Sequence, residues 1–296
     1  MRFFDPFAPQ PRASGAIFTL SCADVAGIVH AVSGFLLEAG CNIVDSAQFR
    51  DGATERFFMR VDVVSADART IDVETLRARF DAIARRFAME WDARDRNARA
   101  RVLVLASRQA HCLNDLLFRY GTGDLLVEIP AIISNHTDVS RLAEAYGVAF
   151  HHLPISPENK AVQEARLLEI IEREAIDLVV LARYMQILSP DLCEKLKRRA
   201  INIHHSFLPS FAGAKPYHQA YARGVKLIGA TAHFVTGDLD EGPIIEQDIA
   251  RVTHAATVDE LVATGRDIES AVLSRAVKLF VERRVLLNGT RTIVFR

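Results

Sequence analysis

The chain has 296 residues, half of them hydrophobic and a quarter charged, and its formal net charge at pH 7 is -1. This length allows one large domain or two ordinary ones, and the composition is that of a globular protein. The balanced charge excludes the global positive field that draws proteins onto nucleic acid, so we expect no nucleic-acid partner.

The N-terminal third of the chain alternates between strand-like and helical patterns. Strands are expected at residues 16–22, 42–49, 55–64 and 88–91, and amphipathic helices at residues 26–39 and 71–87. A hairpin turn at Arg50-Asp51-Gly52 is expected to join the second and third strands. The resulting order, β-α-β-β-α-β, is the split βαβ plan of a ferredoxin-like α+β domain, which we place at residues 1–92. Residues 93–100 are dense in charge, and we expect a linker there.

From residue 101 onwards, apolar runs alternate with helical patterns, as in a parallel sheet whose strands are buried on both faces. Strands are expected at residues 102–106, 128–134, 152–155, 178–182, 200–205, 227–235 and 243–252. Helices are expected at residues 113–120 and 142–146, and from the cap Ser156-Pro157 to residue 174. Two more are expected after the cap Ser189-Pro190 and from the capping box of Thr257 and Glu260 to residue 283. Asn288-Gly289 predicts a terminal hairpin. This succession predicts a doubly wound, mostly parallel α/β domain over residues 101–296.

The four cysteines, Cys22, Cys41, Cys112 and Cys193, are scattered along the chain and form no Cys-x-x-Cys pair. We therefore expect buried thiols rather than disulfides or zinc ligands. Residues 1–11 hold no long apolar run, which predicts neither a signal peptide nor a membrane anchor. Together these features predict a cytoplasmic protein with no membrane partner.

The sharpest local pattern is Asn202-Ile203-His204-His205-Ser206-Phe207-Leu208-Pro209. Residues two apart on a strand share a face, so Asn202 and His204 are expected to project together. They should lie near the end of the strand, because Pro209 cannot continue a central strand, and ligands bind at that end of an open α/β sheet. An amide beside an imidazole suits a carbonyl oxygen that becomes negative during nucleophilic attack.

A second candidate is the turn-rich loop from Gly237 to Pro243, which lies between two predicted strands. Asp240 in this loop could orient the imidazole and relay a proton. From the spacing alone, a structural histidine and a solvated loop acid remain the commoner interpretation of the two patterns. No metal is expected, because His204 and His205 should point to opposite faces of the strand and no third ligand is spaced to join them.

Three segments in combination resemble the signature of the folate-dependent formyltransferase superfamily. They are Asn202-x-His204 with Ser206-x-Leu208-Pro209, His233-Phe234-Val235 leading to Leu239-Asp240-x-Gly242-Pro243, and the stretch from Leu181 to Pro190. The resemblance covers residues 100–296 and implies that Asn202, His204 and Asp240 are catalytic. It also implies a pocket for the folate head group lined by Met185, Gln186, Ile187, Leu188, Gly237, Asp238 and Leu239.

The acceptor of the formyl group has to be argued separately. Transformylases of glycinamide ribonucleotide have a glycine-serine loop after the first strand of this domain. The equivalent residues here, 106–113, contain no glycine that would let a phosphate approach the backbone, and nothing in the sequence supplies a large basic surface for tRNA. With neither acceptor provided for, water is the remaining nucleophile.

The segments Ser107–Leu117, Asn202–Pro209 and Gly213–His218 together resemble those of formyltetrahydrofolate deformylases. The resemblance implies hydrolysis of the folate substrate, 10-formyltetrahydrofolate, to formate and tetrahydrofolate without a cofactor. Such a reaction would balance the one-carbon pool and supply formate for purine synthesis.

Deformylases of this kind begin with an ACT domain, and Asp24-x-x-Gly27-Ile28-Val29 and Asn42-Ile43-Val44 resemble its turn and its second strand. The resemblance implies a regulatory domain that pairs side by side in a homo-oligomer, either a dimer or a tetramer. It also implies an effector site for an amino acid such as glycine or methionine, formed by Asp24, Gly27, Ile28, Asn42 and Ile43. A dimerisation module without an effector is the equal alternative.

Two rival functions stay open at this point: a transformylase with another amine acceptor, and an amino-acid sensor with a vestigial folate domain. The intact set of Asn202, His204 and Asp240 argues against the sensor. A non-catalytic domain has no chemical reason to keep all three residues.

Overall fold

A computed structural model describes residues 13–208 and 216–296 of the chain. The N-terminal stretch predicted to lack a leader and Pro209 lie outside the described residues. The chain divides into two compact units. The first comprises Met1–Ala98, Glu282–Asn288 and Ile293–Arg296, and the second comprises Arg99–Val281 and Gly289–Thr292.

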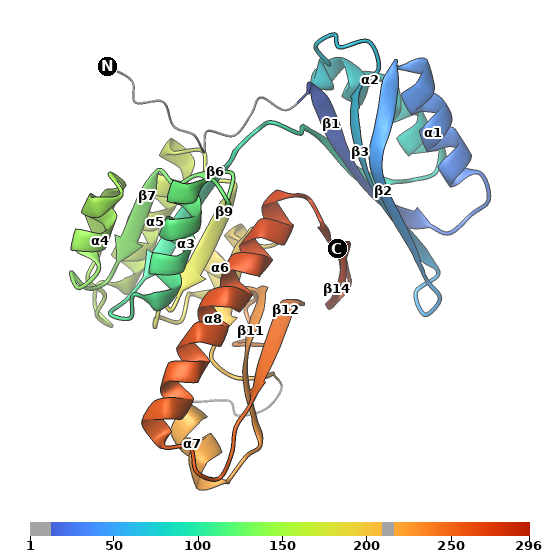
Figure 1. Cartoon of the computed structure of the whole chain (residues 1–296). Helices are drawn as coiled ribbons and strands as arrows, with labels where there is room; N and C mark the ends of the chain where they lie inside the picture. The colour runs from blue at the N-terminus through green and yellow to red at the C-terminus, as the bar shows by residue number, and fades with distance from the viewer. Residues whose placement is uncertain (1–12, 209–215) are drawn as a thin grey trace. The chain divides into compact units, whose positions relative to one another are not determined.

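The first unit, within the described residues, is a four-stranded antiparallel sheet packed against helices α1 and α2 (Figure 1). Its elements in chain order are β1 (Gly15–Ala23), α1 (Ile28–Glu38), β2 (Cys41–Asp51), β3 (Arg56–Ser65), α2 (Val73–Arg86) and β4 (Glu90–Asp95). The strands lie in the order β2-β3-β1-β4. The predicted βαββαβ plan is therefore confirmed.

An aromatic cluster forms the centre of the core between this sheet and its helices. The ring of Phe80 on α2 is fully buried, and its centroid lies 5.4 Å from that of Phe18, 5.2 Å from that of Phe35 and 4.8 Å from that of Trp91. All three contacts are edge-to-face, the geometry that aromatic quadrupoles favour. The apolar stripe predicted on this helix thus supplies the residue around which the other rings gather.

The C-terminal segment Glu282–Asn288 completes the first unit. Arg60 of β3 is fully buried, donates to the backbone oxygen of Glu282 at 3.1 Å and pairs with Asp45 at 2.8 Å. Asn288 donates to Thr54 Oγ1 at 3.2 Å. Glu282 and Asp45 stabilise the guanidinium of Arg60, which would be costly to bury alone.

The unit boundaries differ from the predicted domains in two places. Residues 282–288 and 293–296, predicted to belong to the second domain, are part of the first unit. The predicted linker at residues 93–100 instead contains the end of β4 and the beginning of the next strand. Local sequence patterns do not reveal contacts between residues more than two hundred positions apart, which explains the first difference.

The second unit, within the described residues, contains an eight-stranded sheet. Its strands are β5 (Ala100–Ala106), β6 (Val127–Glu128), β7 (Ala131–Ser134), β8 (Ala149–His152), β9 (Leu178–Ala182), β10 (Ala200–His204), β11 (Leu227–Phe234) and β12 (Ile244–Arg251). They lie in the order β12-β11-β10-β9-β5-β7-β8, with β6 beside β5. The pairs from β8 to β10 are parallel, and β11 and β12 are antiparallel to their neighbours. The prediction of a mostly parallel α/β sheet is confirmed.

Helices cover both faces of this sheet (Figure 1). They are α3 (His111–Thr122), α4 (Ser140–Ala145), α5 (Lys160–Arg173), α6 (Pro190–Lys195), α7 (Pro216–Ala222) and α8 (Val258–Val281). Helices α5 and α6 share one core with residues of β5 and β9, whereas α8 packs on β10, β11 and β12 and alongside α3. The predicted terminal hairpin is formed by β13 (Val285–Asn288) and β14 (Arg291–Val294).

Several element boundaries differ from the sequence prediction. Helix α5 begins at Lys160 rather than at Ser156, because the side chain of Asn159 accepts from the Ser156 N–H at 2.8 Å and closes a turn before the helix. Strand β8 lies at residues 149–152 rather than 152–155, residues 128–134 form two strands, and the first hairpin turns after Asp51 rather than at residues 50–52. The cap predicted at Ser156 is therefore wrong, and the other two predicted caps are confirmed: Ser189 accepts from the Leu192 N–H at 3.2 Å, and Thr257 and Glu260 form their capping box.

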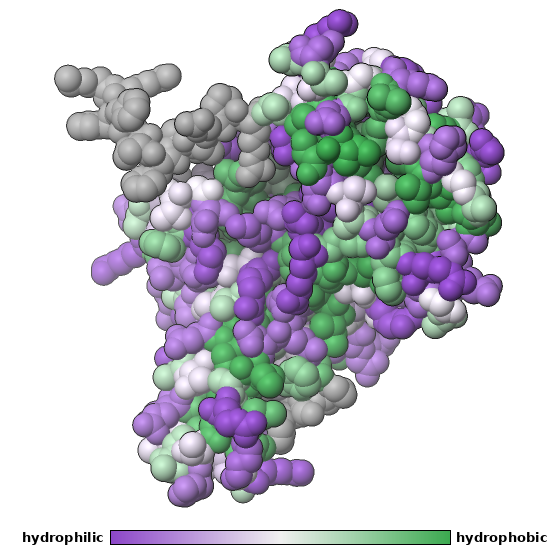
Figure 2. Space-filling model, turned by 45° about the vertical axis from the view of Figure 1, so that its right-hand side comes forward, coloured by the Kyte–Doolittle hydropathy of each residue, from purple (hydrophilic) through white to green (hydrophobic). Residues whose placement is uncertain are grey.

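The surface in Figure 2 shows hydrophilic side chains with apolar ones between them. Large exposed apolar side chains include Val44 on the edge strand β2. None of the helices in residues 13–208 and 216–296 combines the length and the apolar content needed to cross a membrane. All four cysteines are free and buried, as predicted.

Replacing Phe80 by Ala should lower the free energy of unfolding of the first unit by about 3–5 kcal/mol, because it leaves a cavity inside the aromatic cluster. Leu37→Ala on α1, where the side chain is 76% exposed, should change it by less than about 0.5 kcal/mol. Urea unfolding followed by the fluorescence of Trp91, the single tryptophan of the sequence, measures both. Equal unfolding midpoints for the two variants would contradict this account of the core.

Candidate active site

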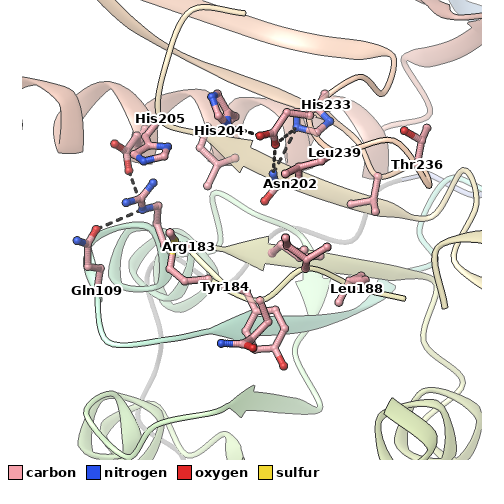
Figure 3. A pocket seen from close by; sticks show the side chains of 18 of the residues that line it. Gln109, Arg183, Tyr184, Leu188, Asn202, His204, His205, His233, Thr236 and Leu239 are labelled. Atoms are coloured by element: carbon pink, nitrogen blue, oxygen red, sulfur yellow. Dashed lines mark hydrogen bonds and ion pairs between the residues drawn. The ribbon is translucent and has the colours of Figure 1, made fainter. Parts of the chain in front are cut away.

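The predicted polar residues meet at one edge of the sheet of the second unit. Strands β9 and β10 run parallel with Leu181 beside Asn202, so their carboxyl ends lie side by side where open α/β sheets bind ligands. On its other side β10 pairs antiparallel with β11, and this register sets His233 opposite Asn202. A cavity of about 660 Å³ opens at this edge, and Figure 3 shows side chains that line it.

Asp240 contacts three polar side chains in the wall of this cavity. Its Oδ2 lies 3.0 Å from Nδ1 of His204. Its Oδ1 lies 3.5 Å from Nδ2 of Asn202 and 3.5 Å from Nε2 of His233. The three residues predicted to be catalytic therefore come together, with His233 as an additional member.

The backbone of the loop explains how the carboxylate reaches this position. Asp240 has a left-handed conformation with φ of 60°, which aspartate adopts more readily than most residues. Two residues later, a Cβ on Gly242 would lie 1.7 Å from the backbone oxygen of Phe234, so a residue without a side chain is required for this close passage. The loop is thereby held against β11 with the carboxylate directed at His204.

The hydrogen-bond partners determine which ring nitrogens carry protons. A carboxylate oxygen only accepts, so Nδ1 of His204 donates to Asp240. Nδ1 of His233 donates to the backbone oxygen of Phe234 at 2.9 Å, so in the neutral ring Nε2 accepts from Asn202 Nδ2 at 3.3 Å. Nε2 of His204 is buried and has no hydrogen-bond partner among the described residues. It is the atom that this set leaves available to a substrate.

Asp240 is ionised in this environment. Burial raises the pKa of its carboxyl group, but the contacts with the rings of His204 and His233 outweigh burial and hold the pKa well below its ordinary value. A fixed negative charge beside His204 stabilises the imidazolium that forms when Nε2 takes up a proton. The arrangement therefore provides an acid–base group in the wall of the cavity.

One end of the cavity is largely apolar and contains every residue predicted for the folate pocket. These residues are Met185, Gln186, Ile187, Leu188, Gly237, Asp238 and Leu239. Ile187 and Leu239 are each 63% exposed although they are large and apolar, which leaves an apolar surface open to a ligand. The hydroxyl of Ser107 accepts from the backbone N–H of Met185 at 3.1 Å and fastens the loop after β9. This end suits a flat ring system of a ligand.

His205 lines the same cavity as His204, contrary to the prediction that the two point to opposite faces. Strand β10 ends at His204, so the alternation of a strand does not extend to His205, and the two ring centroids lie 5.2 Å apart. The ring of Tyr217 follows at 6.3 Å from that of His205. Burial and the nearby Arg183 lower the pKa of His205 from its ordinary 6.5 to about 4, so this ring is neutral near pH 7.

The other end of the cavity holds an ionic cluster around Glu269 of α8, which is 1% exposed; it is called the Glu269 cluster below. His111 Nε2 and Arg183 Nε lie 2.8 and 3.3 Å from one carboxylate oxygen, and the hydroxyl of Tyr217 donates to the other at 2.6 Å. Gln109 accepts from Arg183 at 3.2 Å, as Figure 3 shows. Burial raises the pKa of Glu269, but these contacts outweigh burial and hold the pKa below its ordinary value. The carboxylate is therefore ionised, and the positive charge of Arg183 balances it.

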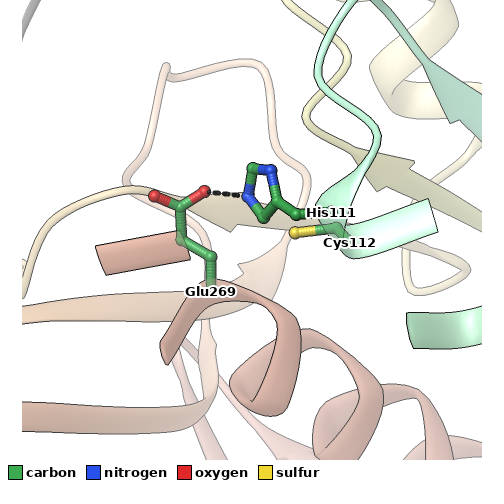
Figure 4. A group of neighbouring side chains, drawn as sticks. All are labelled: His111, Cys112 and Glu269. Atoms are coloured by element: carbon green, nitrogen blue, oxygen red, sulfur yellow. Dashed lines mark hydrogen bonds and ion pairs between the residues drawn. The ribbon is translucent and has the colours of Figure 1, made fainter. Parts of the chain in front are cut away.

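His111, Cys112 and Glu269 also present ligand atoms within 4.8 Å of one another (Figure 4). The guanidinium of Arg183 contacts the same carboxylate oxygen as His111, and a fixed cation there opposes a metal ion. Burial raises the pKa of the Cys112 thiol well above its ordinary value, whereas metal binding requires the thiolate. The chemistry of this group fits an ion-pair network rather than a metal site.

The residues predicted for the effector site fall into two groups that are far apart within one chain. Asn42 and Ile43 lie at the end of the sheet where β1 begins, whereas Asp24, Gly27 and Ile28 follow the end of β1. The strand is nine residues long, so the groups are separated by roughly 25 Å. Ile28 is buried in the core. A small effector that touches both groups therefore requires a second chain.

Sequence reasoning did not identify His233, His205 or the Glu269 cluster as parts of the site. The position of His233 depends on the pairing of β10 with β11, which no local pattern reveals. A usable signal existed for Arg183, because it is a polar residue directly after a buried strand that ends at the ligand-binding edge.

Comparison with known proteins gives a consistent result. The family described as formyl transferase matches residues 100–277. The formyltetrahydrofolate deformylase of Corynebacterium sp. (strain P-1) is 50% identical over 280 residues, which are 95% of this chain and 98% of that relative. The crystal structure of formyltetrahydrofolate deformylase from Burkholderia mallei ATCC 23344 is 52% identical, has a TM-score of 0.91 and covers 95% of this chain and 99% of its own. The crystal structure of a formyltetrahydrofolate deformylase from Pseudomonas syringae pv. tomato str. DC3000 is 43% identical and has a TM-score of 0.93. It covers 97% of this chain and 96% of its own.

Lowering the pH from 6.5 towards 4.5 should reduce the free energy of unfolding, and His205→Gln should weaken this dependence. In that range the unfolded chain protonates His205 and the folded chain does not, because its folded pKa is about 4, so stability is lost as the pH falls. Arg183, Glu269, His204, Asp240 and Tyr217 face this ring. The pKa values of the two carboxyl groups are depressed, so their contribution begins to be lost near pH 4.5, where carboxyl groups of the unfolded chain take up protons.

Urea unfolding followed by circular dichroism at pH 7.5, 6.5, 5.5 and 4.5 measures the effect. His218→Gln removes an exposed imidazole and should leave the slope unchanged. Identical slopes for the wild type and His205→Gln would show that His205 is charged in the folded protein.

Proposed function

Because this chain belongs to the formyltetrahydrofolate deformylase family, we infer that it hydrolyses 10-formyltetrahydrofolate to formate and tetrahydrofolate. The similarity that carries this inference extends over nearly the whole length of the chain, and so includes the N-terminal unit. The presence of Asn202, His204 and Asp240 in one cavity supports it. Family membership favours the hydrolase over both the amine transformylase and the amino-acid sensor.

We propose that the formyl group binds between Asn202 and His204. The two contacts of Asn202 Nδ2, at 3.3 Å to His233 and 3.5 Å to Asp240, are long for hydrogen bonds and therefore weak. An oxygen that becomes negative during attack is a stronger acceptor and competes for one of these N–H groups. Asn202 then stabilises the tetrahedral oxyanion, and His233 holds the amide in position until the substrate arrives.

His204 moves the proton in this mechanism. Its Nε2 takes a proton from water as the water oxygen attacks the formyl carbon, and the Asp240 carboxylate stabilises the resulting imidazolium through Nδ1. The same proton passes to N10 of the folate as the carbon–nitrogen bond breaks. The products are tetrahydrofolate, with hydrogen on N10, and formic acid, which ionises to formate.

The folate head group occupies the apolar end of the cavity in this proposal. The loop from Met185 to Leu188 lies on one side and the loop from Gly237 to Leu239 on the other, and both line the cavity. The exposed side chains of Ile187 and Leu239 gain apolar contact when a ring covers them. This gain supports binding of a pterin at this end.

The reaction releases formate and restores free tetrahydrofolate, so we propose that the enzyme balances the one-carbon pool and supplies formate for purine synthesis. The four free, buried thiols support a reducing, cytoplasmic setting.

The N-terminal unit is proposed to be an ACT-like regulatory domain that pairs with a second copy in a dimer or tetramer. The apolar side chains of Ile43, Val44 and Phe49 are 38%, 50% and 46% exposed on the edge strand β2, a surface that a second copy would cover. A second copy would also bring Asn42 and Ile43 near the Asp24–Ile28 turn of its neighbour. Calorimetric titration with glycine and methionine tests whether that interface binds an effector.

His204→Ala and Asp240→Asn should each lower kcat for formate release by roughly 100- to 10,000-fold, because each removes part of the proton path. Asn202→Ala should lower it by roughly 100- to 1,000-fold through the loss of an oxyanion donor. Formate release from 10-formyltetrahydrofolate, with no acceptor added, measures all three. His254→Ala removes an exposed histidine of the same unit as a control. Near-normal turnover by His204→Ala would rule out this site.

Val44→Lys should dissociate the oligomer, because a charge on an edge strand opposes pairing with a second copy. Size-exclusion chromatography with light scattering should give a multiple of 32.9 kDa for the wild type and a lower mass for the variant. Val162→Lys, at a 55% exposed position on α5, should keep the mass of the wild type. A monomeric wild type, or an unchanged mass for Val44→Lys, would contradict the proposed interface.

A further inference from the structure

The cavity has an apolar end and an ionic end, and the ionic end has no part in the mechanism derived above. We propose that the Glu269 cluster closes the side from which a second substrate would approach the formyl carbon, so that water is the acceptor. This inference rests on the proposed deformylase function. It names the residues that make the enzyme a hydrolase rather than an amine formyltransferase.

The position of the cluster relative to His204 supports this role. With the folate at the apolar end, an acceptor has to reach the formyl carbon from the opposite side of His204. On that side the rings of His205 and Tyr217 follow one another, with centroids 5.2 Å from His204 to His205 and 6.3 Å from His205 to Tyr217. The hydroxyl of Tyr217 is in turn 2.6 Å from Glu269. Side chains joined to one another therefore form the wall of the cavity on the side from which a bulky amine would approach.

Two backbone features show that the cluster is built into the fold. Arg183, which directly follows β9, has a left-handed backbone with φ of 61°, an uncommon conformation for arginine, and its side chain turns towards Glu269. A Cβ on Gly265 would lie 2.2 Å from Cζ of Tyr217, so the ring of Tyr217 rests directly on α8. Gly265 precedes Glu269 by one helical turn, which brings the hydroxyl within reach of the carboxylate.

The cluster offers little to an incoming amine. Both oxygens of Glu269 already accept hydrogen bonds, and the charge of the carboxylate is matched by Arg183. Burial and Glu269 raise the pKa of Tyr217, so its hydroxyl keeps the proton that it donates. An amine that used this acid would displace a donor from a buried ion pair, at a cost on the order of 100-fold in affinity or more. A water molecule needs only the free Nε2 of His204.

The loop after β5 offers a phosphorylated acceptor no free group at two of its polar positions. The hydroxyl of Ser107 donates to Asn135 at 2.6 Å and accepts from the backbone of Met185 at 3.1 Å. Its hydrogen-bonding capacity is thus used inside the protein. His111, at the start of α3, is likewise committed to Glu269.

The test supplies an amine and measures both products. The full-length enzyme is incubated with 10-formyltetrahydrofolate and glycinamide, a small primary amine, and formate and N-formylglycinamide are quantified by mass spectrometry. The variants are Arg183→Ala combined with Glu269→Ala, which leaves neither charge buried alone, and Tyr217→Phe, which keeps the ring on Gly265 and removes one donor. Asp267→Asn is the control, because it removes an exposed carboxylate from the same helix.

Wild type and Asp267→Asn should release formate with no more than a trace of formylated amine. The double variant should raise the ratio of formylated amine to formate by roughly 100-fold, and Tyr217→Phe should raise it by about tenfold. Product ratios equal to that of the wild type in both variants would overturn the proposal and leave the deformylase function intact. If the double variant does not fold, an unchanged ratio in Tyr217→Phe overturns it. A wild type that releases no formate would instead contradict the proposed function.

Discussion

The ionised carboxylate of Asp240 is the constraint on which the rest of the second unit depends. A charge withdrawn from water is stable only if donors are already in place around it, and here they come from β10. Strand β10 supplies His204 and Asn202, and β11 sets His233 beside Asn202 through an antiparallel register. The reversal from parallel to antiparallel pairing at β10 therefore has a chemical reason. It sets His233 where its ring can hold the amide that contacts the acid.

The cavity contains two anions, the half-buried Asp240 and the buried Glu269, and their partners separate their roles. Asp240 contacts Nδ1 of His204, whose Nε2 has no hydrogen-bond partner among the described residues, so its charge can support proton transfer at that atom. Glu269 has both oxygens occupied, one by His111 and Arg183 and the other by the hydroxyl of Tyr217, so its charge serves to hold a shape. One cavity can thus be reactive at its centre and inert at one end.

The parts of the fold and site that follow from local periodicity could be predicted from the sequence. The alternation of a strand placed Asn202 and His204 on one face, and turn chemistry placed Asp240 in a loop beside them. The same rule failed at His205, because the strand stops one residue earlier and alternation has no meaning beyond it. It also missed the pairing of Arg183 with Glu269, and the register that brings in His233, since both depend on how distant elements pack. The late start of α5 has a local cause that the cap pattern at Ser156 did not reveal. The side chain of Asn159 accepts from the backbone N–H of Ser156 and closes a turn before the helix.

The C-terminal segment that completes the N-terminal unit has a consequence for synthesis on the ribosome. Arg60 donates to the backbone oxygen of Glu282, which lies 222 residues further along the chain, and Asp51 accepts from Asn288, which lies 237 residues further along. At about 5–20 residues per second, this delay amounts to roughly 10–50 seconds of translation. During that time a nascent chain carries an unfinished first unit, while residues 99–281 of the second unit emerge behind it. The first unit is therefore begun before the second unit but completed only after residues 99–281 have been made.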